Sequence, residues 1–199
     1  MKLFLLRHGL TDWNAEKRIQ GSIDRPLSEA GIAQIQKRAL PESLRHLTWY
    51  CSPMLRARQT AELMQIQSPV LEPALKEMNW GDWEGKILKP LRKQLGDSMR
   101  DNEARGCDFC PPGGESPRQV QMRLKPWLAK IHAKGEDCAA VVHKGIIRCI
   151  YALAFDWDMR GESPVAFDWS QLHEFEIGVD GKLTRQYRGL ALIEKANED

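Results

Sequence analysis

Residues 2–9 read KLFLLRHG, an apolar run that stops abruptly at an arginine, a histidine and a glycine. After its first residue the run is apolar without alternation, which is typical of a strand buried on both faces of a sheet. CAAVV (138–142) has the same character and leads directly into His143. Such strands occur in parallel sheets that are covered by helices on both sides. The two runs therefore predict the central strands of an α/β fold.

Short β-type runs alternate with segments of helical periodicity along the rest of the chain. The pattern predicts, in chain order, a helix at 28–39, a strand at 47–51, a helix at 52–65, a strand at 69–73 and helices at 116–135 and 145–155. LHEFEI (172–177) and LTRQYR (183–188) are joined through Asp180-Gly181 and predict a hairpin. We therefore predict a doubly wound, mostly parallel central sheet with helices on both faces and one antiparallel edge strand.

Two of these helices carry start signals. Ser52-Pro53 and Ser116-Pro117 each place a serine at the N-cap and a proline at the first helical position. The helix after Ser116 also has an apolar stripe at helical spacing, formed by Val120, Leu124, Trp127, Leu128 and Ile131. We expect this stripe to lie in the core.

The chain has 199 residues, of which 42% are hydrophobic and 28% charged, and this suits one domain with a substantial core. Residues 84–115 differ from the rest, because glycine, proline and charged residues interrupt weak helical pieces there. We expect a single domain over 1–199, in which residues 84–115 form a loop and helix insertion over one end of the sheet.

The net charge of +2 is too small to favour nucleic-acid or membrane binding by bulk electrostatics. The longest apolar runs, such as IYALAF (150–155), are far shorter than the roughly 18 residues that a membrane span needs. The odd count of five cysteines suits a reducing compartment. We therefore expect a cytoplasmic protein with no nucleic-acid or membrane partner. Cys107 and Cys110 are interpreted as plain thiols, with a metal or redox role as the alternative.

Basic and imidazole side chains follow the apolar strands. Arg7 and His8 come after the first strand, Arg56 lies in the first turn of the helix after the second, and His143 follows CAAVV. Ligands of open α/β sheets bind beyond the carboxyl ends of the strands, so these four residues are expected to converge there. Each alone is more often structural or solvated, and it is their convergence that indicates an anion site.

Phosphate fits such a site best. The planar guanidinium fork of arginine pairs with phosphate oxygens and balances the charge that spreads over them during phosphoryl transfer. A histidine beside arginines has a lowered pKa and stays neutral, so its ring nitrogen can attack phosphorus. The covalent phosphohistidine that results splits hydrolysis into two displacements.

Six segments extend this pattern over most of the chain. They are LLRHGLTDWN (5–14), QGSIDRPLSEAG (20–31), SPMLRARQTAEL (52–63), LKEMNWGDWEGK (75–86), PPGGES (111–116) and VVHKGIIR (141–148). In this order they resemble the motifs of the histidine phosphatase superfamily, the group that includes the cofactor-dependent phosphoglycerate mutases. The resemblance implies a phosphoglycerate mutase-like fold and phosphoryl-transfer chemistry.

The resemblance also implies a role for each matching position. His8 matches the nucleophile that becomes phosphorylated, and Glu77 matches the usual general acid and base. The implied phosphate pocket consists of Arg7, Arg56, His143 and Asn14. The implied rim of the substrate site includes Thr11, Gln20 and Gly21.

Elementary chemistry agrees with the role of Glu77. The leaving oxygen needs a proton, and the attacking water must later lose one. A carboxyl group beside Trp80 and Trp83 would have a pKa raised by desolvation, which would let it carry that proton. The alternative for Glu77 is an exposed loop carboxylate. Four tryptophans near the motifs either line the substrate mouth or cover the core: Trp80, Trp83, Trp157 and Trp169.

One position departs from the family pattern. The family commonly has H-G-G where this chain has His143-Lys144-Gly145. The Lys144 side chain either points away, the interpretation that we favour, or reaches over the pocket to bind a second anionic group of the substrate. The second interpretation would favour a doubly charged substrate such as a phosphorylated acid.

The leading functional hypothesis is a phosphatase that hydrolyses a small phosphomonoester through phosphohistidine. We expect no metal and no other cofactor, because arginines take the place that a metal has in other phosphatases. One alternative is a mutase, which returns the phosphate to a second hydroxyl, although mutases of this family resemble longer chains. The other is an inactive domain that binds phosphorylated ligands. The sequence determines neither the substrate nor whether the protein is a homodimer.

Overall fold

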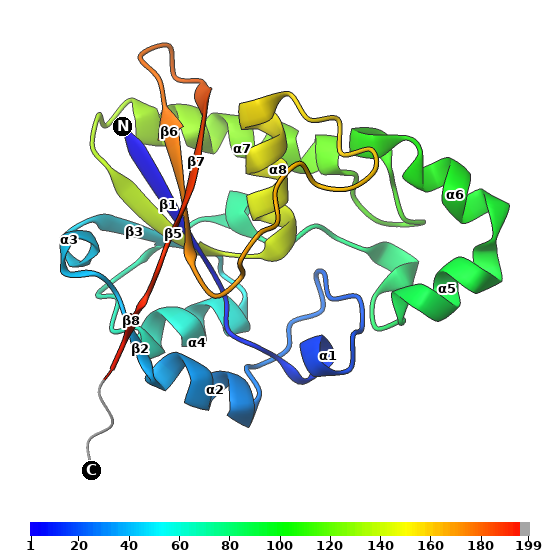
Figure 1. Cartoon of the computed structure of the whole chain (residues 1–199), viewed down its shortest axis with the longest axis horizontal. Coiled ribbons are helices and arrows are strands. Elements are labelled where there is room, and N and C mark those ends of the chain that lie inside the picture. Colours follow the sequence, from blue (N-terminus) through cyan, green and yellow to red (C-terminus); the bar gives the residue numbers. More distant parts are fainter. Residues whose placement is uncertain (196–199) are drawn as a thin grey trace.

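The computed structural model describes residues 1–195, and its centre is a six-stranded sheet of order β4-β3-β5-β1-β6-β7 (Figure 1). The strands are β1 (Lys2–Arg7), β3 (Thr48–Cys51), β4 (Val70–Leu71), β5 (Cys138–Val142), β6 (Leu172–Ile177) and β7 (Leu183–Leu190). β1, β3, β4 and β5 are parallel, whereas β6 is antiparallel to both β1 and β7. The mostly parallel sheet is confirmed, and the predicted hairpin supplies its antiparallel strand.

Helices cover both faces of this sheet. One layer consists of α7 (Pro117–His132) and α8 (Lys144–Phe155), and the other of α2 (Glu29–Gln36) and α4 (Leu55–Leu63). Successive residues of β1 face opposite layers, because Leu3 and Leu5 pack toward α7 and α8, whereas Phe4 and Leu6 pack toward α2 and α4. This two-sided burial explains why the run LFLL contains no polar residue.

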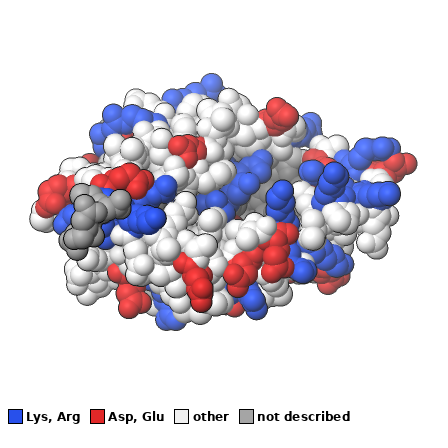
Figure 2. All heavy atoms as spheres, turned by 60° about the horizontal axis from the view of Figure 1, so that its bottom comes forward, with Lys and Arg blue, Asp and Glu red and all other residues white. Residues whose placement is uncertain are grey.

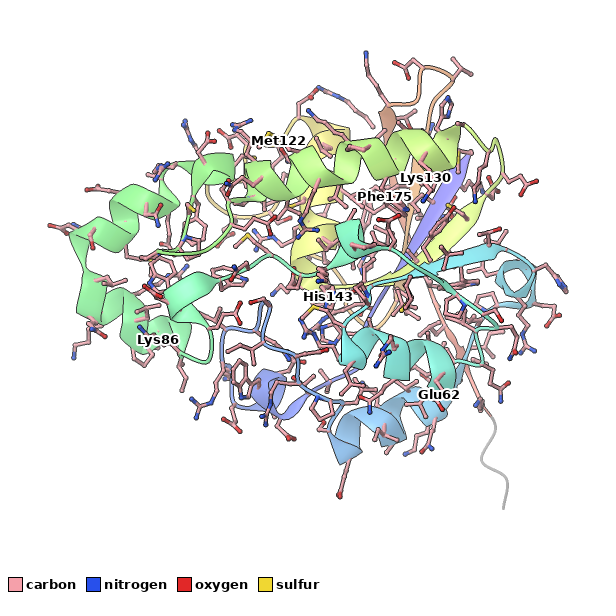
Figure 3. The ribbon with its side chains drawn as sticks, turned by 180° about the vertical axis from the view of Figure 1, so that it is seen from behind. Glu62, Lys86, Met122, Lys130, His143 and Phe175 are labelled. Carbon is pink, nitrogen blue, oxygen red and sulfur yellow. The ribbon has the colours of Figure 1, made fainter. Side chains whose placement is uncertain are left out.

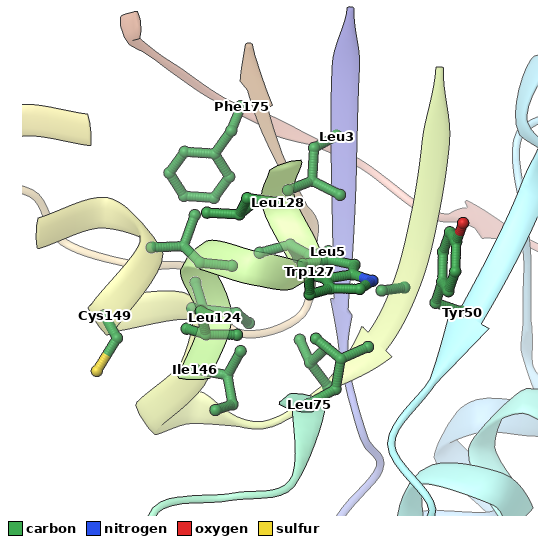
Figure 4. Close-up of a cluster of buried hydrophobic side chains, with 14 of the residues drawn as sticks. Leu3, Leu5, Tyr50, Leu75, Leu124, Trp127, Leu128, Ile146, Cys149 and Phe175 are labelled. Carbon is green, nitrogen blue, oxygen red and sulfur yellow. The ribbon is translucent and has the colours of Figure 1, made fainter. Parts of the chain in front are cut away.

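The core between the sheet and α7 is shown in Figure 4. Leu5 of β1 and Leu124 of α7 are fully buried, and the rings of Trp127 and Tyr50 meet edge to face at 5.7 Å. Burying one leucine side chain contributes about 1.5–3 kcal/mol to folding. The apolar stripe predicted on this helix therefore lies in the core.

The start of α7 is as predicted. The Ser116 hydroxyl accepts a hydrogen bond from the Gln119 amide at 3.2 Å, and the Gln119 side chain accepts one from the Ser116 amide at 2.7 Å. Pro117 takes the first helical position. This reciprocal cap satisfies two amides that the helix itself leaves without partners.

The start of α4 differs from the prediction of a helix that begins at Ser52-Pro53. The helix begins at Leu55, and the Leu55 amide donates to both carboxylate oxygens of Asp24, at 2.9 and 2.8 Å. The Ser52 hydroxyl instead lies 2.7 Å from a ring nitrogen of His143. Asp24, which is remote in the sequence, thus takes the capping role that the pattern assigned to Ser52.

The helix predicted at 28–39 is also shorter in the structure. α2 ends at Gln36, and Arg38–Ala39 (β2) pairs antiparallel with Ile193–Glu194 (β8). The last predicted turn is lost because these residues form a small second sheet with the end of the described chain.

Residues 84–115 contain α5 (Leu88–Leu95) and α6 (Asp97–Glu103), which project to one side of the sheet in Figure 1. A small core of Ile19, Trp83, Leu91 and Met99 joins them to the rest. The remaining helices are α1 (Asp12–Ala15), α3 (Glu42–Arg45) and three 3₁₀ turns at Pro73–Leu75, Gly81–Trp83 and Gly106–Asp108. Within residues 1–195 no helix is long and apolar enough to cross a membrane.

Candidate active site

The sheet brings the ends of three strands together. β5 lies between β1 and β3, and the His8 amide donates to the Val142 carbonyl at 2.9 Å, while the Ser52 amide donates to the Val141 carbonyl at 3.0 Å. His8, Ser52 and His143 therefore follow three neighbouring strands at one edge. Figure 3 shows His143 in the middle of the molecule, at this edge of the sheet. The predicted convergence of His8 and His143 is thus present in the structure.

The His8 ring is held in one orientation. It is buried, and Nδ1 lies 2.7 Å from the Gly9 carbonyl oxygen, which can only accept a hydrogen bond. Nδ1 therefore carries the ring proton, and Nε2 of the neutral ring keeps a free electron pair. Burial lowers the pKa of His8 well below its usual value, and the charges of Arg56 and Arg7 lower it further. The site thus holds the neutral form that a nucleophile needs.

Gly9 is set by close packing. A Cβ at this position would lie 3.0 Å from Ile35 Cγ1 and 3.3 Å from Leu27 Cδ2. Its amide donates to the Thr60 hydroxyl of α4 at 2.9 Å. The glycine therefore lets the chain turn tightly against α2 and fixes the carbonyl that orients His8.

His143 lies against His8, with ring centroids 5.0 Å apart and an interplanar angle of 57°. Its Nε2 is 2.7 Å from the Ser52 hydroxyl, whereas its Nδ1 is buried without a hydrogen-bond partner among residues 1–195. Burial lowers the pKa of His143 well below its usual value, and the charge of Arg56 lowers it further. Both imidazoles are therefore neutral at physiological pH.

Arg56 is the largest fully buried side chain of the described residues. Its guanidinium donates to the Gly21 carbonyl at 2.9 Å and lies 3.6 Å from an Asp24 carboxylate oxygen. Its Nε, like that of the half-buried Arg7, has no hydrogen-bond partner in this part of the chain. Burial lowers the pKa of both arginines, which remain charged in proteins. Two positive charges beside a neutral imidazole make a site for a compact anion.

Gly21 shapes the loop that holds Arg56. A Cβ there would clash with the Glu84 carboxylate and lie 2.7 Å from the Met78 carbonyl oxygen. Glu84 accepts hydrogen bonds from the Ser22 amide at 2.6 Å and the Ile23 amide at 2.7 Å. Gly21, predicted at the substrate rim, thus acts on the site through its carbonyl contact with Arg56.

The other predicted rim residues form one network. The Thr11 hydroxyl lies within hydrogen-bond distance of the side-chain oxygens of Asn14, at 3.2 Å, and Gln20, at 3.0 Å, and can donate to one of them at a time. The Gln20 amide nitrogen is buried without a partner among residues 1–195. Thr11 is fully buried and caps α1, so it holds the side-chain oxygens of Asn14 and Gln20 in place.

Glu77 is buried, which overturns the alternative of an exposed loop carboxylate. Its carboxylate accepts hydrogen bonds from the Met78 amide at 2.9 Å and the Gly145 amide at 3.1 Å. Burial raises the pKa of Glu77, against the opposing effects of these amides and of Arg56 and Arg123. A Cβ on Gly145 would collide with the carboxylate, so the second glycine of the H-G-G pattern is needed here.

The backbone of Glu77 is fixed by Arg123, which the sequence analysis did not identify. Arg123 donates to the carbonyls of Lys76, at 2.8 Å, and Glu77, at 3.3 Å, and pairs with Glu115 at 2.8 Å. Sequence reasoning also missed Ser52 and Glu84 as supports of the site. The only sequence signal for them is their place inside the quoted motifs.

The tryptophans divide between core and site. Trp83 is buried in the small core with Leu91, and its ring lies 5.6 Å from that of Phe109. Trp169 instead lies beneath two cations, with Arg7 Cζ 5.6 Å and Lys144 Nζ 5.1 Å from its ring centroid. Lys144 and Arg7 therefore share one aromatic neighbour, and whether Lys144 points away from the substrate or binds it stays a prediction.

Two hollows border the catalytic candidates. One of about 370 Å³ is lined by Arg7, His8, Phe167 and Trp169 among others. The other, of about 570 Å³, borders Glu77 and Arg123. No group of three or more His, Cys, Asp or Glu side chains within the described residues is arranged to hold a metal ion. The positive charge at the site comes from the arginines.

A sequence model of the histidine phosphatase superfamily, branch 1, matches residues 3–187. The chain belongs to this superfamily. It is 32% identical to phosphoglycerate mutase-like protein 4 of Arabidopsis thaliana over 77% of this chain and 70% of that protein. It is 34% identical to the metal-independent phosphoserine phosphatase of the same plant, over 75% of this chain and 67% of that protein. This histidine phosphatase is thus an enzyme of the phosphatase class.

The fold agrees with that assignment. A mycobacterial glucosyl-3-phosphoglycerate phosphatase, solved in complex with VO3, has a TM-score of 0.77 with this chain, covering 96% of this chain and 97% of that one. At 24% identity this likeness shows the fold alone. The phosphoglycerate mutase-like architecture of the chain is therefore established.

Proposed function

We propose that this histidine phosphatase hydrolyses a small phosphomonoester without a metal ion, through a phosphohistidine at His8. The observation that carries the proposal is the orientation of His8, whose Nδ1–H is bonded to the Gly9 carbonyl while Nε2 stays unprotonated beside Arg7 and Arg56. A neutral ring nitrogen held next to two guanidinium groups is suited to attack a phosphate dianion.

In the first step, the electron pair of His8 Nε2 forms the N–P bond as the P–O ester bond breaks. The leaving oxygen takes a proton from the carboxyl group of Glu77, whose raised pKa favours the protonated form. Arg7 and Arg56 balance the charge on the three equatorial oxygens. The products of this step are the free alcohol and the phosphoenzyme.

In the second step, water attacks phosphorus and the N–P bond breaks. The Glu77 carboxylate accepts the proton that the water loses, which restores the starting acid. Phosphate leaves, and His8 is again neutral. His143 supports both steps when Ser52 donates to its Nε2, because Nδ1 then carries a proton for a phosphate oxygen. The unpartnered amide of Gln20 and that of Asn14 supply further donors.

The proposal is tested by hydrolysis of p-nitrophenyl phosphate in excess EDTA, for the native protein and His8→Ala. We expect activity that survives EDTA and is lost in the variant. A phosphoenzyme that is labile in acid and stable in alkali should form in the native protein alone. Equal activity of His8→Ala and the native protein would contradict the nucleophile assignment.

A mutase shares the first step and remains the second candidate, since one relative is named as phosphoglycerate mutase-like. In that reaction the phosphoenzyme returns its phosphate to a second hydroxyl of the substrate. The two are separated by isomerisation of 3-phosphoglycerate with and without a bisphosphate. Stimulation by the bisphosphate, together with slow hydrolysis, would replace the phosphatase proposal with the mutase.

A further inference from the structure

Two basic side chains extend the phosphate pocket along α8. Lys144 and Arg148 are four residues apart and so lie on one face of the helix that begins directly after His143. Lys144 Nζ shares the Trp169 ring with Arg7, at 5.1 and 5.6 Å from the centroid. Arg148 lies over Trp157, with Cζ 5.4 Å from that ring. The cations of the pocket therefore continue from Arg7 onto α8.

Within residues 1–195 these three cations form no ion pair. None of the ion pairs between residues 1–195 involves Arg7, Lys144 or Arg148. The Nε atoms of Arg7 and Arg148 are buried without a hydrogen-bond partner in that part of the chain. Arg123, by contrast, is fully bonded to Glu115 and to backbone carbonyls. A buried donor without a partner destabilises the fold, and such groups in native proteins indicate a ligand or a functional constraint.

The cations also disfavour one another. Partial desolvation lowers the pKa of Lys144, and the neighbouring charges of Arg148 and Arg7 lower it further, whereas Glu77 opposes them. Glu77 is the proposed proton donor and is itself held by the Gly145 amide. Because a protonated carboxyl group has no charge, Glu77 in that form does not neutralise Lys144 and Arg148.

The number of positive charges exceeds what one phosphate needs. Arg7 and Arg56 already match a phosphate dianion at His8. Lys144 and Arg148 add two charges on α8, and Lys144 is close enough to Arg7 for the Arg7 charge to lower the pKa of Lys144. Figure 2 shows Lys and Arg side chains gathered around the hollow in the middle of this face of the molecule. Trp169, whose ring lies against the Lys144 ammonium group, also lines the hollow that reaches His8.

We propose that Lys144 and Arg148 form a second anion subsite, which binds a carboxylate or second phosphate of the same phosphomonoester that His8 attacks. This inference rests on the proposed function and narrows its substrate to doubly anionic esters. Trp157 and Trp169 hold the two cations against flat apolar surfaces, so less side-chain entropy is lost when the anion binds. An ester with an uncharged alcohol leaves the pair unneutralised and binds less well.

The test compares substrates that differ only in the second anion. The ratio of kcat/KM for 3-phosphoglycerate to that for glycerol 3-phosphate measures the preference for a carboxylate. The ratio of kcat/KM for fructose 2,6-bisphosphate to that for fructose 6-phosphate measures the preference for a second phosphate. The native protein is expected to prefer at least one doubly anionic ester by tenfold or more. Lys144→Met and Arg148→Met should each reduce that ratio at least fivefold.

Lys134→Met is the matched control. Lys134 also lies over an aromatic ring, 5.5 Å from the centroid of Tyr50, but it precedes β5, whereas Lys144 follows it. Its replacement should leave the substrate ratio unchanged. A native ratio near one for both pairs, or a ratio that Lys144→Met and Arg148→Met do not alter, would overturn the subsite.

Binding separates failure of the subsite from failure of the proposed function. Calorimetric titration of His8→Ala with the same four esters requires no turnover. Loss of all hydrolysis in the native protein, with Lys144-dependent binding of a doubly anionic ester retained, would contradict the phosphatase and leave the subsite standing. Hydrolysis of p-nitrophenyl phosphate, with no preference for a second anion in either the kinetic or the binding assay, would support the phosphatase and contradict the subsite.

Discussion

The core beneath α7 and the pocket at the carboxyl ends of β1, β3 and β5 both contain fully buried side chains, but the surroundings of those side chains differ. Leu5 and Arg56 both have no exposed surface. Leu5 is surrounded by apolar side chains, whereas Arg56 keeps a buried nitrogen without a partner among the described residues. Burial in the core stabilises the fold, and burial in the pocket costs stability while preparing charges for an anion.

The sharpest way to separate the two regions is His8→Ala. We expect kcat for p-nitrophenyl phosphate to fall by about 10⁴-fold or more, because the covalent step is lost. The free energy of unfolding should change by less than about 2 kcal/mol, since the His8 ring contributes to ligand binding and little to the packing that stabilises the fold. Steady-state kinetics and urea unfolding measure the two effects. A large loss of stability with residual activity would mean that His8 belongs with the core.

Glu77→Gln tests the proton donor of the pocket. We expect kcat to fall by roughly 10²–10³-fold for an alkyl phosphate, because the alkoxide leaves unprotonated. The loss should be smaller for p-nitrophenyl phosphate, whose leaving group needs little help. Since burial raises the pKa of Glu77, the native rate should fall as the pH rises through that pKa, and the variant should lack this limb. Equal losses for both substrates would contradict the role.

Leu124→Ala is the opposite perturbation, confined to the core. Leu124 is fully buried within the cluster that Figure 4 shows, and its truncation should lower the free energy of unfolding by about 2–5 kcal/mol. The kcat of the folded protein should stay within about threefold of the native value. A fall of kcat by more than tenfold in protein that is fully folded would show that the pocket depends directly on packing beneath α7.

Acid sensitivity should arise from three buried histidines. Two of them, His8 and His143, lie in the pocket, and burial lowers the pKa of the third, His173 of β6, to about 4. His8 and His143 have folded pKa values well below 6.5, so only the unfolded chain binds these protons as the pH falls below about 6.5. Stability is therefore lost on acidification, by about 1–2 kcal/mol for each histidine between pH 7 and pH 5. Urea unfolding at both pH values measures this loss, which should be smaller in His143→Asn. An unchanged loss in the variant would place the sensitivity elsewhere.

Local patterns in the sequence predicted much of the fold. The uninterrupted apolar run before Arg7 marked a central strand, and Ser116 with Pro117 marked the start of α7. Both signals act within a few residues, and no distant residue displaces them, as Asp24 displaces Ser52 at the start of α4. The end of α2 was wrong because β2 pairs with β8, about 150 residues away in the chain. That residues 84–115 form an insertion within one domain stays a prediction.

The sequence by itself determined the family and the mostly parallel sheet, and it predicted that Arg7, His8, Arg56 and His143 converge at one edge. Only the tertiary structure decided their partners: Asp24 rather than Ser52 caps α4, Ser52 contacts His143, and Lys144 lies over Trp169 beside Arg7. Periodicity and capping are properties of neighbouring residues. A contact such as that between Ser52 and His143 joins residues 91 positions apart, and it exists only because the sheet places β3 next to β5.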